Sequence, residues 1–253
     1  MWMAGVAMDV SAVRARARVA VRATARVAVA AALTLTGCAE AREDVHNTLT
    51  AAEREAGWAL LFDGRSLEGW RGYNRPDIPE GWAVEHGTLA WVAGGGDIIT
   101  ERQFTDFELT LDWRVEPGGN SGVFYRAAEG EDWIHQSAPE LQVLDDEGHA
   151  DGQSPLTSAG SNFGLHGAPR GAVRPAGEWN SVRIVVEGNH VEHWLNGMRV
   201  VEYELGSTAW EGLVQASKFA AWPAYGRAPS GHIGLQDHDS RVWYRNIKIR
   251  ELP

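Results

Sequence analysis

A strict alternation of apolar and polar side chains over residues 107–115 constrains the fold more than any other feature of the sequence. Successive side chains of a β-strand point to opposite faces, so this segment has one apolar face and one wet face. We therefore predict a long strand whose apolar face packs on a core. The apolar side chains stand at every second position: Phe107, Leu109, Leu111, Trp113 and Val115.

Shorter apolar segments separated by turn residues follow this one. Asn196-Gly197 is the strongest short hairpin signal in the chain. The apolar parity changes between Tyr244 and Ile247, so we expect a β-bulge near Arg245-Asn246. No helical periodicity of useful length is found after residue 57. Strands are predicted in 57–64, 82–92 (two, about His86-Gly87), 122–126, 140–144, 179–187, 190–202 (crossing the hairpin), 231–236 and 241–250.

Composition supports the same fold class. The 29 glycines and 10 prolines are scattered between the apolar runs, which favours many turns over a helical bundle. The 12 tryptophans exceed the usual share, and we expect most of them in the core. Many short antiparallel strands without parallel crossovers indicate an all-β, two-sheet sandwich.

The first 37 residues have the pattern of a targeting segment. Five arginines precede a short apolar run, and Leu35-Thr36-Gly37-Cys38 closes it with small residues, which resembles a bacterial lipoprotein signal. Cys38 would then be the lipidated first residue of the mature protein; the alternative is an ordinary secretory signal. Residues 38–56 are predicted as a tether with a short helix, since Thr50 and Glu53 have capping-box spacing, and 57–253 as the β-sandwich domain.

Net charge limits the partners. The chain carries −11, but residues 1–37 carry +4, so the rest carries −15. Such an acidic body repels phosphate, which argues against nucleic acid and anionic lipid surfaces. We expect a neutral substrate, and contact with a membrane only through the lipid anchor of a protein in the bacterial cell envelope.

The stretch 139–146, PELQVLDD, places carboxylates in a predicted strand. Glu140 and Gln142 share one strand face, about 7 Å apart. A bulge at the strand end could turn Asp145 onto that face. Such a cluster can donate and accept protons in sugar chemistry, although an exposed strand followed by an acidic turn is an equally good reading.

Motifs of several enzyme classes are absent from the sequence. It contains no Cys-x-x-Cys, no His-Glu-x-x-His, no phosphate-binding glycine loop with a Lys-Ser/Thr tail and no Gly-x-Ser-x-Gly. The glycines at 94–96 are read as a loop.

Seven segments of the chain, taken in order, form a recognisable set. They are LLFDGRSLEGW (60–70), DFELTLDWRV (106–115), NSGVFYR (120–126), PELQVLDD (139–146), GEWNSVRIVVEG (177–188), WLNG (194–197) and GHIGLQDHDSRVWYRNIKI (231–249). Together they resemble the 3-keto-disaccharide hydrolase domains, a family with a concanavalin A-like jelly-roll fold. The resemblance covers about residues 57–252, and it departs from the family pattern in QDHDS, where Asp239 stands in place of an expected glycine.

The resemblance implies cleavage of glycosides that carry a ketone at carbon 3 of the sugar. A ketone there acidifies the hydrogen on carbon 2, so a base can remove it and the enolate can expel the group on carbon 1. Family members are described as lyases of this kind and as hydratases of the resulting 2-hydroxyglucal. The sequence does not distinguish elimination, hydration and hydrolysis.

Roles for individual residues follow from the resemblance. Glu140 would be the base or the leaving-group acid, Asp145 its partner or a metal ligand, and His238 a proton shuttle. The only cofactor to consider is a divalent cation, which the carboxylates could hold. The residues expected to bind the 3-keto sugar are Asn120, Arg126, Gln142, Gln236, Trp133, Trp222 and Tyr225.

Two other readings remain open. A retaining glycosidase of the same fold would need a third carboxylate where Gln142 stands, and the short side chain of Asp145 makes a carboxyl separation of about 5.5 Å hard to reach. A non-catalytic carbohydrate-binding module would use Trp133, Trp222 and Tyr225, which lie in predicted loops, as an aromatic platform. Such a module would keep its affinity for sugar when Glu140 is replaced in Glu140→Gln.

The lipoprotein reading is tested by Cys38→Ser. We expect the wild-type protein to fractionate with membranes, and the variant to become soluble or to remain unprocessed, because the acylated thiol is lost. Membrane fractionation and intact mass measure the two outcomes. Identical fractionation and mass for both proteins would contradict the prediction.

Overall fold

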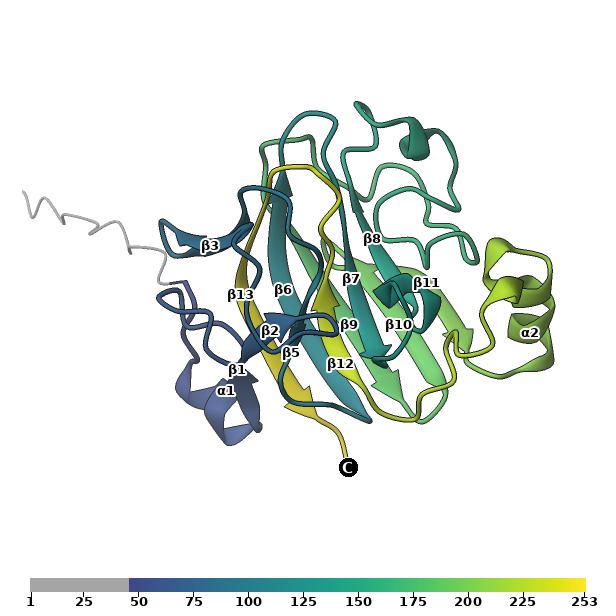
Figure 1. Cartoon of the computed structure of the whole chain (residues 1–253), viewed down its shortest axis with the longest axis horizontal. Coiled ribbons are helices and arrows are strands. Elements are labelled where there is room, and N and C mark those ends of the chain that lie inside the picture. Colours follow the sequence, from purple (N-terminus) through teal and green to yellow (C-terminus); the bar gives the residue numbers. More distant parts are fainter. Residues whose placement is uncertain (1–45) are drawn as a thin grey trace, which may run out of the picture. The chain divides into compact units, whose positions relative to one another are not determined.

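The computed structural model describes residues 46–253, which form two antiparallel β-sheets packed face to face (Figure 1). The predicted all-β sandwich is confirmed. The predicted signal segment and Cys38 lie outside the described residues. Within residues 46–253, no helix is both long enough and apolar enough to span a membrane.

The larger sheet has eight strands in the order β11-β10-β9-β6-β13-β4-β3, and β1 also pairs with β13. The predicted strand of 107–115 is β6, at the centre of this sheet. Its strands are β1 (Trp58–Leu60), β3 (Trp82–Glu85), β4 (Thr88–Trp91), β6 (Phe107–Val115), β9 (Asn180–Glu187), β10 (His190–Leu195), β11 (Met198–Glu204) and β13 (Val242–Glu251).

The smaller sheet has five strands in the order β2-β5-β12-β7-β8. Two of them, β2 and β5, were not predicted, because three-residue strands show no periodicity. The strands are β2 (Trp70–Gly72), β5 (Ile98–Thr100), β7 (Asn120–Ala127), β8 (Glu140–Leu144) and β12 (His232–Leu235).

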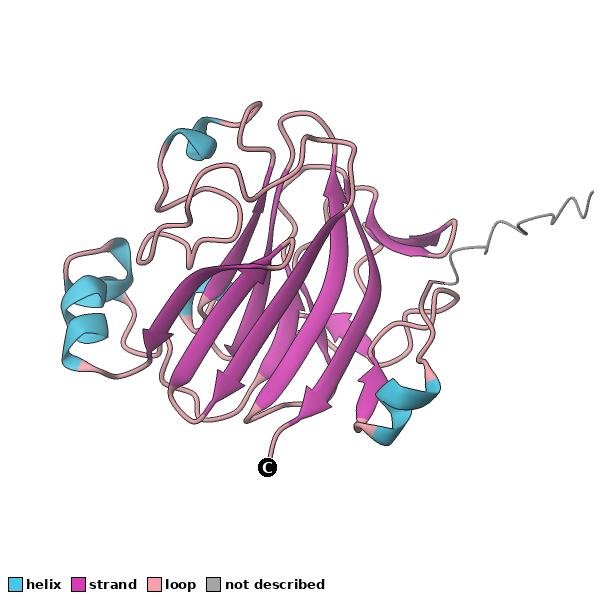
Figure 2. Cartoon of the chain, turned by 180° about the vertical axis from the view of Figure 1, so that it is seen from behind, coloured by secondary structure: helices cyan, strands magenta, loops and turns pink. Residues whose placement is uncertain are grey.

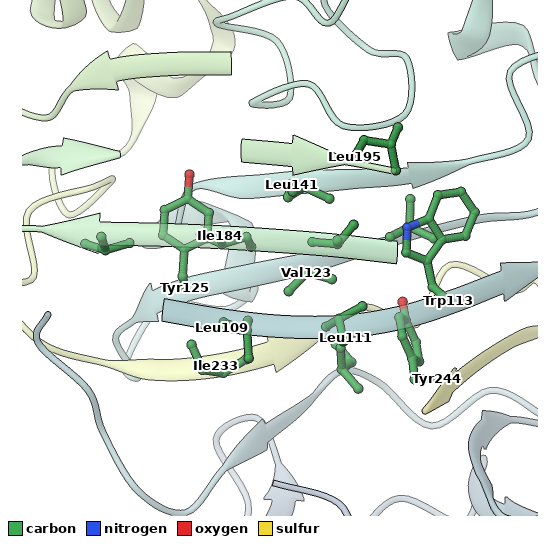
Figure 3. Packing of buried hydrophobic residues seen from close by; sticks show 14 of the residues in the cluster. Leu109, Leu111, Trp113, Val123, Tyr125, Leu141, Ile184, Leu195, Ile233 and Tyr244 are labelled. Atoms are coloured by element: carbon green, nitrogen blue, oxygen red, sulfur yellow. The ribbon is translucent and has the colours of Figure 1, made fainter. Parts of the chain in front are cut away.

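The core lies between the sheets, where alternate side chains of β6 meet those of β7 and β8 (Figure 3). Leu109, Leu111 and Trp113 are at most 1% exposed, as are Val123 and Tyr125 opposite them. Of the 11 tryptophans described, five are buried, five are half-buried and Trp133 is exposed, so the core takes fewer of them than the sequence predicted.

The two short α-helices lie at the margins of the sheets (Figure 1 and Figure 2). The predicted helix after Thr50 is α1 (Ala51–Glu55), and its capping box with Glu53 is present. The prediction of no helix after residue 57 was wrong for α2 (Thr208–Gln215), which buries Trp210 and Val214 and is too short for a clear period. Three 3-10 helices are η1 (Ile134–Gln136), η2 (Ala150–Gln153) and η3 (Lys218–Ala221).

The segment before residue 57 packs on the domain. Asn47 is buried and its backbone N–H donates to Asn246 Oδ1 at 2.7 Å. Asn246 has a φ of +53°, and the β13–β6 register shifts between Arg245 and Lys248, so the predicted bulge is confirmed. The predicted tether therefore includes a segment anchored to this bulge.

The predicted hairpin is present, with Leu195 paired to Met198 across Asn196-Gly197. Both turn residues have positive φ, +50° and +81°, as a type I′ turn requires.

Because a β-branched side chain resists positive φ, Gly197→Val should destabilise the fold by on the order of 1 kcal/mol or more. Urea unfolding measures this loss. Gly197→Asn, whose side chain tolerates the left-handed region, is the control and should cost clearly less; equal costs would contradict the turn assignment.

Candidate functional site

A hollow of about 390 Å³ lies on the outer face of the smaller sheet, the face turned away from the core. Leu141 and Val143 of β8 point into the core, so their neighbours point outward into this hollow. The rest of its wall comes from the start of β7, the loop before β5, the loop after β12, the loop between η2 and β9, and the 3-10 helices η1, η2 and η3. The residues are Gly96, Asp97, Asn120, Trp133, His135, Glu140, Gln142, Asp151, Phe163, Lys218, Gln236, Asp237, His238 and Asp239.

Gly122 makes room for the carboxyl group of Glu140. It pairs with Gln142 in the β7–β8 ladder, and a Cβ on Gly122 would lie only 2.1 Å from Glu140 Oε1. When the Gln142 amide is oriented to satisfy both its ends, its nitrogen donates to Glu140 Oε1 (3.1 Å) and to Ser121 O (3.2 Å). Glu140 is therefore held in a fixed position by its neighbours.

Burial dominates the chemistry of Glu140, which is 6% exposed. It raises the pKa of Glu140 to about 8; the charge of Lys218 opposes the rise, and those of Asp97 and Asp151 add to it. The carboxyl group is consequently protonated at neutral pH and can act as a proton donor.

Asp97 is a second carboxyl group with a raised pKa. Burial raises it to about 7, although the backbone N–H of Asp237 donates to its Oδ1 at 2.9 Å. The carboxylate of Asp237 in turn accepts from the backbone of Gly95 (3.0 Å) and Gly96 (2.8 Å). The glycine loop is thereby fastened to the loop after β12, and both loops deliver acids to the hollow.

Lys218 supplies positive charge at the hollow through its ammonium group. It is exposed at the start of η3, and its Nζ lies 4.5 Å from the ring centroid of Phe163. Burial, and to a smaller extent the positive charge of Lys218, lowers the pKa of His135. A cation beside two carboxyl groups can stabilise negative charge that develops on a bound oxygen.

Two side-chain amides, those of Gln236 and Asn120, also border the hollow. Among the described residues, none hydrogen-bonds to the buried Gln236 Oε1, while the backbone N–H of Gln236 donates to Gly122 O at 3.0 Å. Asn120 is 2% exposed, and its Nδ2 is 3.5 Å from His149 Nε2. These amides are suited to binding sugar hydroxyl or keto oxygens.

His238 lies in the exposed loop after β12, with its ring centroid 6.3 Å from that of His149. The residue after it, Asp239, has a φ of +53°. This is the left-handed region that a glycine adopts freely and an aspartate tolerates better than most residues. Asp239 therefore adopts the turn conformation that a glycine would adopt at this position.

Asp145 does not reach the hollow, so the predicted bulge onto the Glu140 face was wrong. The β7–β8 ladder runs without a register shift. The buried Asp145 carboxylate accepts from Gly118 N (2.7 Å) and Glu147 N (3.2 Å). Its role is to join two turns, because an acid directly after a strand satisfies the free N–H groups there.

Arg126 also points elsewhere, which corrects its predicted role in substrate binding. It has a φ of +50° at a bulge where β7 has one residue more than β12. Its guanidinium donates to Thr105 O, Gly188 O and Asp106 Oδ1, the last at 3.0 Å. The bulge turns the side chain away from the hollow.

The predicted aromatic platform is not formed. Tyr225 is 1% exposed, with its ring 4.0 Å from that of Phe219. Trp222 is half-buried against Phe219 and His135 and does not line the hollow. Only Trp133, 59% exposed, borders it. The aromatic side chains after α2 pack into the main hydrophobic core instead, which the sequence did not indicate because the segment has no alternation.

Sequence reasoning missed several lining residues. Asp97 follows the glycine run and Lys218 follows α2, and neither lies in a motif with a recognisable spacing. Asp237 was present in the QDHDS segment but was not singled out. The tight glycine loop was the one usable signal, since glycines permit close approach of backbone to a ligand or to another loop.

Within residues 46–253, one group of three His, Asp or Glu side chains has ligand atoms within 4.8 Å of one another: His190, Glu192 and Glu202. It lies on β10 and β11 of the larger sheet, away from the hollow. Arg199 already pairs with both carboxylates, at 2.8 and 3.0 Å. These carboxylates are therefore neutralised by the protein itself.

Glu140→Gln tests the buried carboxyl group through stability. Its pKa is about 8 in the folded chain against 4.5 for an ordinary glutamate side chain, so the native state keeps a proton that the unfolded state releases. The free energy of unfolding should therefore fall as the pH rises from about 4.5 to about 8, by on the order of a few kcal/mol from Glu140. The variant should show a smaller fall.

Thermal unfolding at about pH 5 and about pH 8.5 measures this difference. Glu55→Gln, on the exposed side of α1, is the matched control and should follow the wild type. The same pH dependence in Glu140→Gln and in the wild type would show that the folded chain does not retain this proton.

Comparison with known proteins agrees with the fold and the sequence motifs. The model of the 3-keto-alpha-glucoside-1,2-lyase-like domain matches residues 57–250. A Bacteroides thetaiotaomicron protein named 3-keto-disaccharide hydrolase is 37% identical over 228 residues, which are 78% of this chain and 79% of that protein.

Two solved structures from Parabacteroides distasonis, both assigned provisionally to the glycosyl hydrolases, are also similar. One is 32% identical with a TM-score of 0.78, covering 83% of this chain and 100% of the other. The second is 34% identical with a TM-score of 0.61, covering 77% and 99%. The chain therefore belongs to the family of 3-keto-alpha-glucoside-1,2-lyase-like domains.

Proposed function

We propose that this protein cleaves 3-keto-glycosides, by removing the proton on carbon 2 and eliminating the group on carbon 1. The observation that carries the proposal is the pair of carboxyl groups with raised pKa, Glu140 and Asp97, at one hollow beside Lys218. The name of the Bacteroides thetaiotaomicron relative, which is a 3-keto-disaccharide hydrolase, supports the substrate class.

The elimination needs a base, a group that stabilises the enolate and an acid. The base takes the carbon 2 proton, and the electron pair of that C–H bond moves toward the keto oxygen. As the ketone re-forms, a double bond arises between carbons 1 and 2 and the bond from carbon 1 to the leaving oxygen breaks. A proton from the acid then neutralises the leaving oxygen.

The two carboxyl groups divide these roles according to their pKa. Asp97, with a pKa of about 7, is partly ionised at neutral pH and acts as the base. Glu140, with a pKa of about 8, is mostly protonated and acts as the acid toward the leaving oxygen. Their proximity couples the two titrations, since the charge of Asp97 raises the pKa of Glu140.

The remaining residues of the hollow bind the sugar. Lys218 stabilises the enolate oxygen through its charge, and Asn120 and Gln236 bind hydroxyl groups. His238 carries a proton to or from water when the unsaturated product is hydrated. The excess of acidic over basic side chains in the wall favours a neutral sugar over an anionic one.

We also propose that the enzyme acts in the bacterial cell envelope, held by a lipid on Cys38. The arginine-rich segment, its apolar run and the small residues before Cys38 support this location. The acidic residues of the remaining chain suit a protein that contacts the membrane through its anchor alone.

A 3-keto-glucoside with deuterium at carbon 2 tests the chemistry. Elimination removes the label as a proton, so deuterium should be lost to solvent and should slow turnover. Glu140→Gln should lower turnover by roughly 10²-fold or more, the usual scale for losing a general acid or base. Mass spectrometry follows the label, and circular dichroism checks the fold of the variant.

Glu55→Gln again serves as the control and should turn over like the wild type. Retention of the label together with cleavage of the unoxidised glycoside would contradict elimination and favour a glycosidase. Full sugar binding without turnover, in wild type and variant alike, would favour a carbohydrate-binding module.

A further inference from the structure

A second and larger hollow, of about 750 Å³, lies on the outer face of the larger sheet. Arg114 of β6 and Trp243 and Arg245 of β13 form its floor, because their strand neighbours Trp113 and Tyr244 point into the core. The β3–β4 turn and the segment from residue 46 border it. It is distinct from the proposed catalytic hollow, which lies on the outer face of the other sheet.

Arg114 is held between two indole rings in this floor. It pairs with Trp243 across the β6–β13 ladder, and its guanidinium carbon lies 4.6 Å from that ring centroid. The same guanidinium carbon lies 4.9 Å from the ring centroid of Trp179, the residue directly before β9. Cation–π contact with both rings fixes the guanidinium and leaves its N–H edges for other partners.

Those edges are not used by the protein. No hydrogen bond or ion pair joins the Arg114 side chain to another of the described residues, and its Nε is buried without an acceptor. Its neighbours differ, since Arg245 pairs with Asp112 at 3.2 Å and Arg241 with Glu85 at 2.6 Å. Burial, and then the charge of Arg245, lower the pKa of Arg114. A positive charge without a counter-ion therefore stands in the floor of the hollow.

We propose that this hollow binds a small acidic saccharide, such as a uronic acid, whose carboxylate is taken by the free edge of the Arg114 guanidinium. Arginine binds carboxylates through two parallel N–H donors in one plane. The indole faces of Trp179 and Trp243 are covered by Arg114, Arg241 and Arg245, so charge rather than ring stacking provides recognition.

The size and rim of the hollow indicate a ligand larger than an inorganic ion. Its volume lies in the range of small-molecule sites. The exposed side chains of Arg65 and His86 line it and can contact sugar hydroxyl groups. This hollow and the proposed catalytic hollow lie on different faces of the molecule, so a test of ligand binding here does not depend on the proposed reaction.

Calorimetric titration of the protein with glucuronate, glucose and inorganic sulfate tests the site. Glucuronate should bind at low salt and glucose should not, since only the first carries a carboxylate. Arg114→Met should weaken glucuronate binding roughly tenfold or more, the scale of a lost charge-assisted pair. Arg114→Lys, which keeps the charge but not the planar fork, should fall between.

Arg227→Met is the matched control. Arg227 also lies over an indole ring, at 4.8 Å from the Trp210 centroid, but it is already paired with Glu211. Its loss should leave glucuronate binding unchanged. Equal binding of sulfate and glucuronate would reduce the site to an adventitious ion only, and absence of glucuronate binding, or equal binding by Arg114→Lys and wild type, would overturn the proposal.

Discussion

The smaller sheet is covered on both of its faces, and the chemistry of the protein depends on this constraint. An antiparallel sheet commonly leaves one face to water. Here Val123 and Leu141 pack in the core, while loops and 3-10 helices cover the outer face above Glu140. Every residue of β8 is consequently buried, and a carboxyl group on its outer face loses its hydration. The raised pKa of Glu140 follows from this architecture rather than from a particular charged neighbour.

Glycines allow the loops to approach so closely. Gly122 leaves space for the Glu140 carboxyl group, and Gly95 packs where a Cβ would lie 2.8 Å from Pro79. The carboxylate of Asp237 then binds the backbone of the glycine loop and positions Asp97. Two buried acids with raised pKa values reduce the stability of the fold as the pH rises, a cost that functional sites commonly carry and that the large sandwich core offsets.

The two hollows differ in the balance of charged side chains that line them. Around the hollow of the smaller sheet, five carboxyl groups stand beside the single lysine, Lys218. On the other face, arginines alternate with indole rings along β13 and its neighbours, and one of these arginines lacks a counter-ion. In a chain with a net charge of −11, this local excess of positive charge is an exception that a bound anion would neutralise.

Local periodicity determined much of the fold. The alternation in β6, the Asn196-Gly197 hairpin and the parity change in β13 each specify local geometry, so they were predicted from neighbouring residues alone. The shared face of Glu140 and Gln142 followed from the same period. Asp97 and Lys218 joined that face only through loop packing between segments distant in sequence, and a bulge turned Arg126 away from it. Only the tertiary structure could decide these positions, because burial and loop contacts leave no period in the sequence.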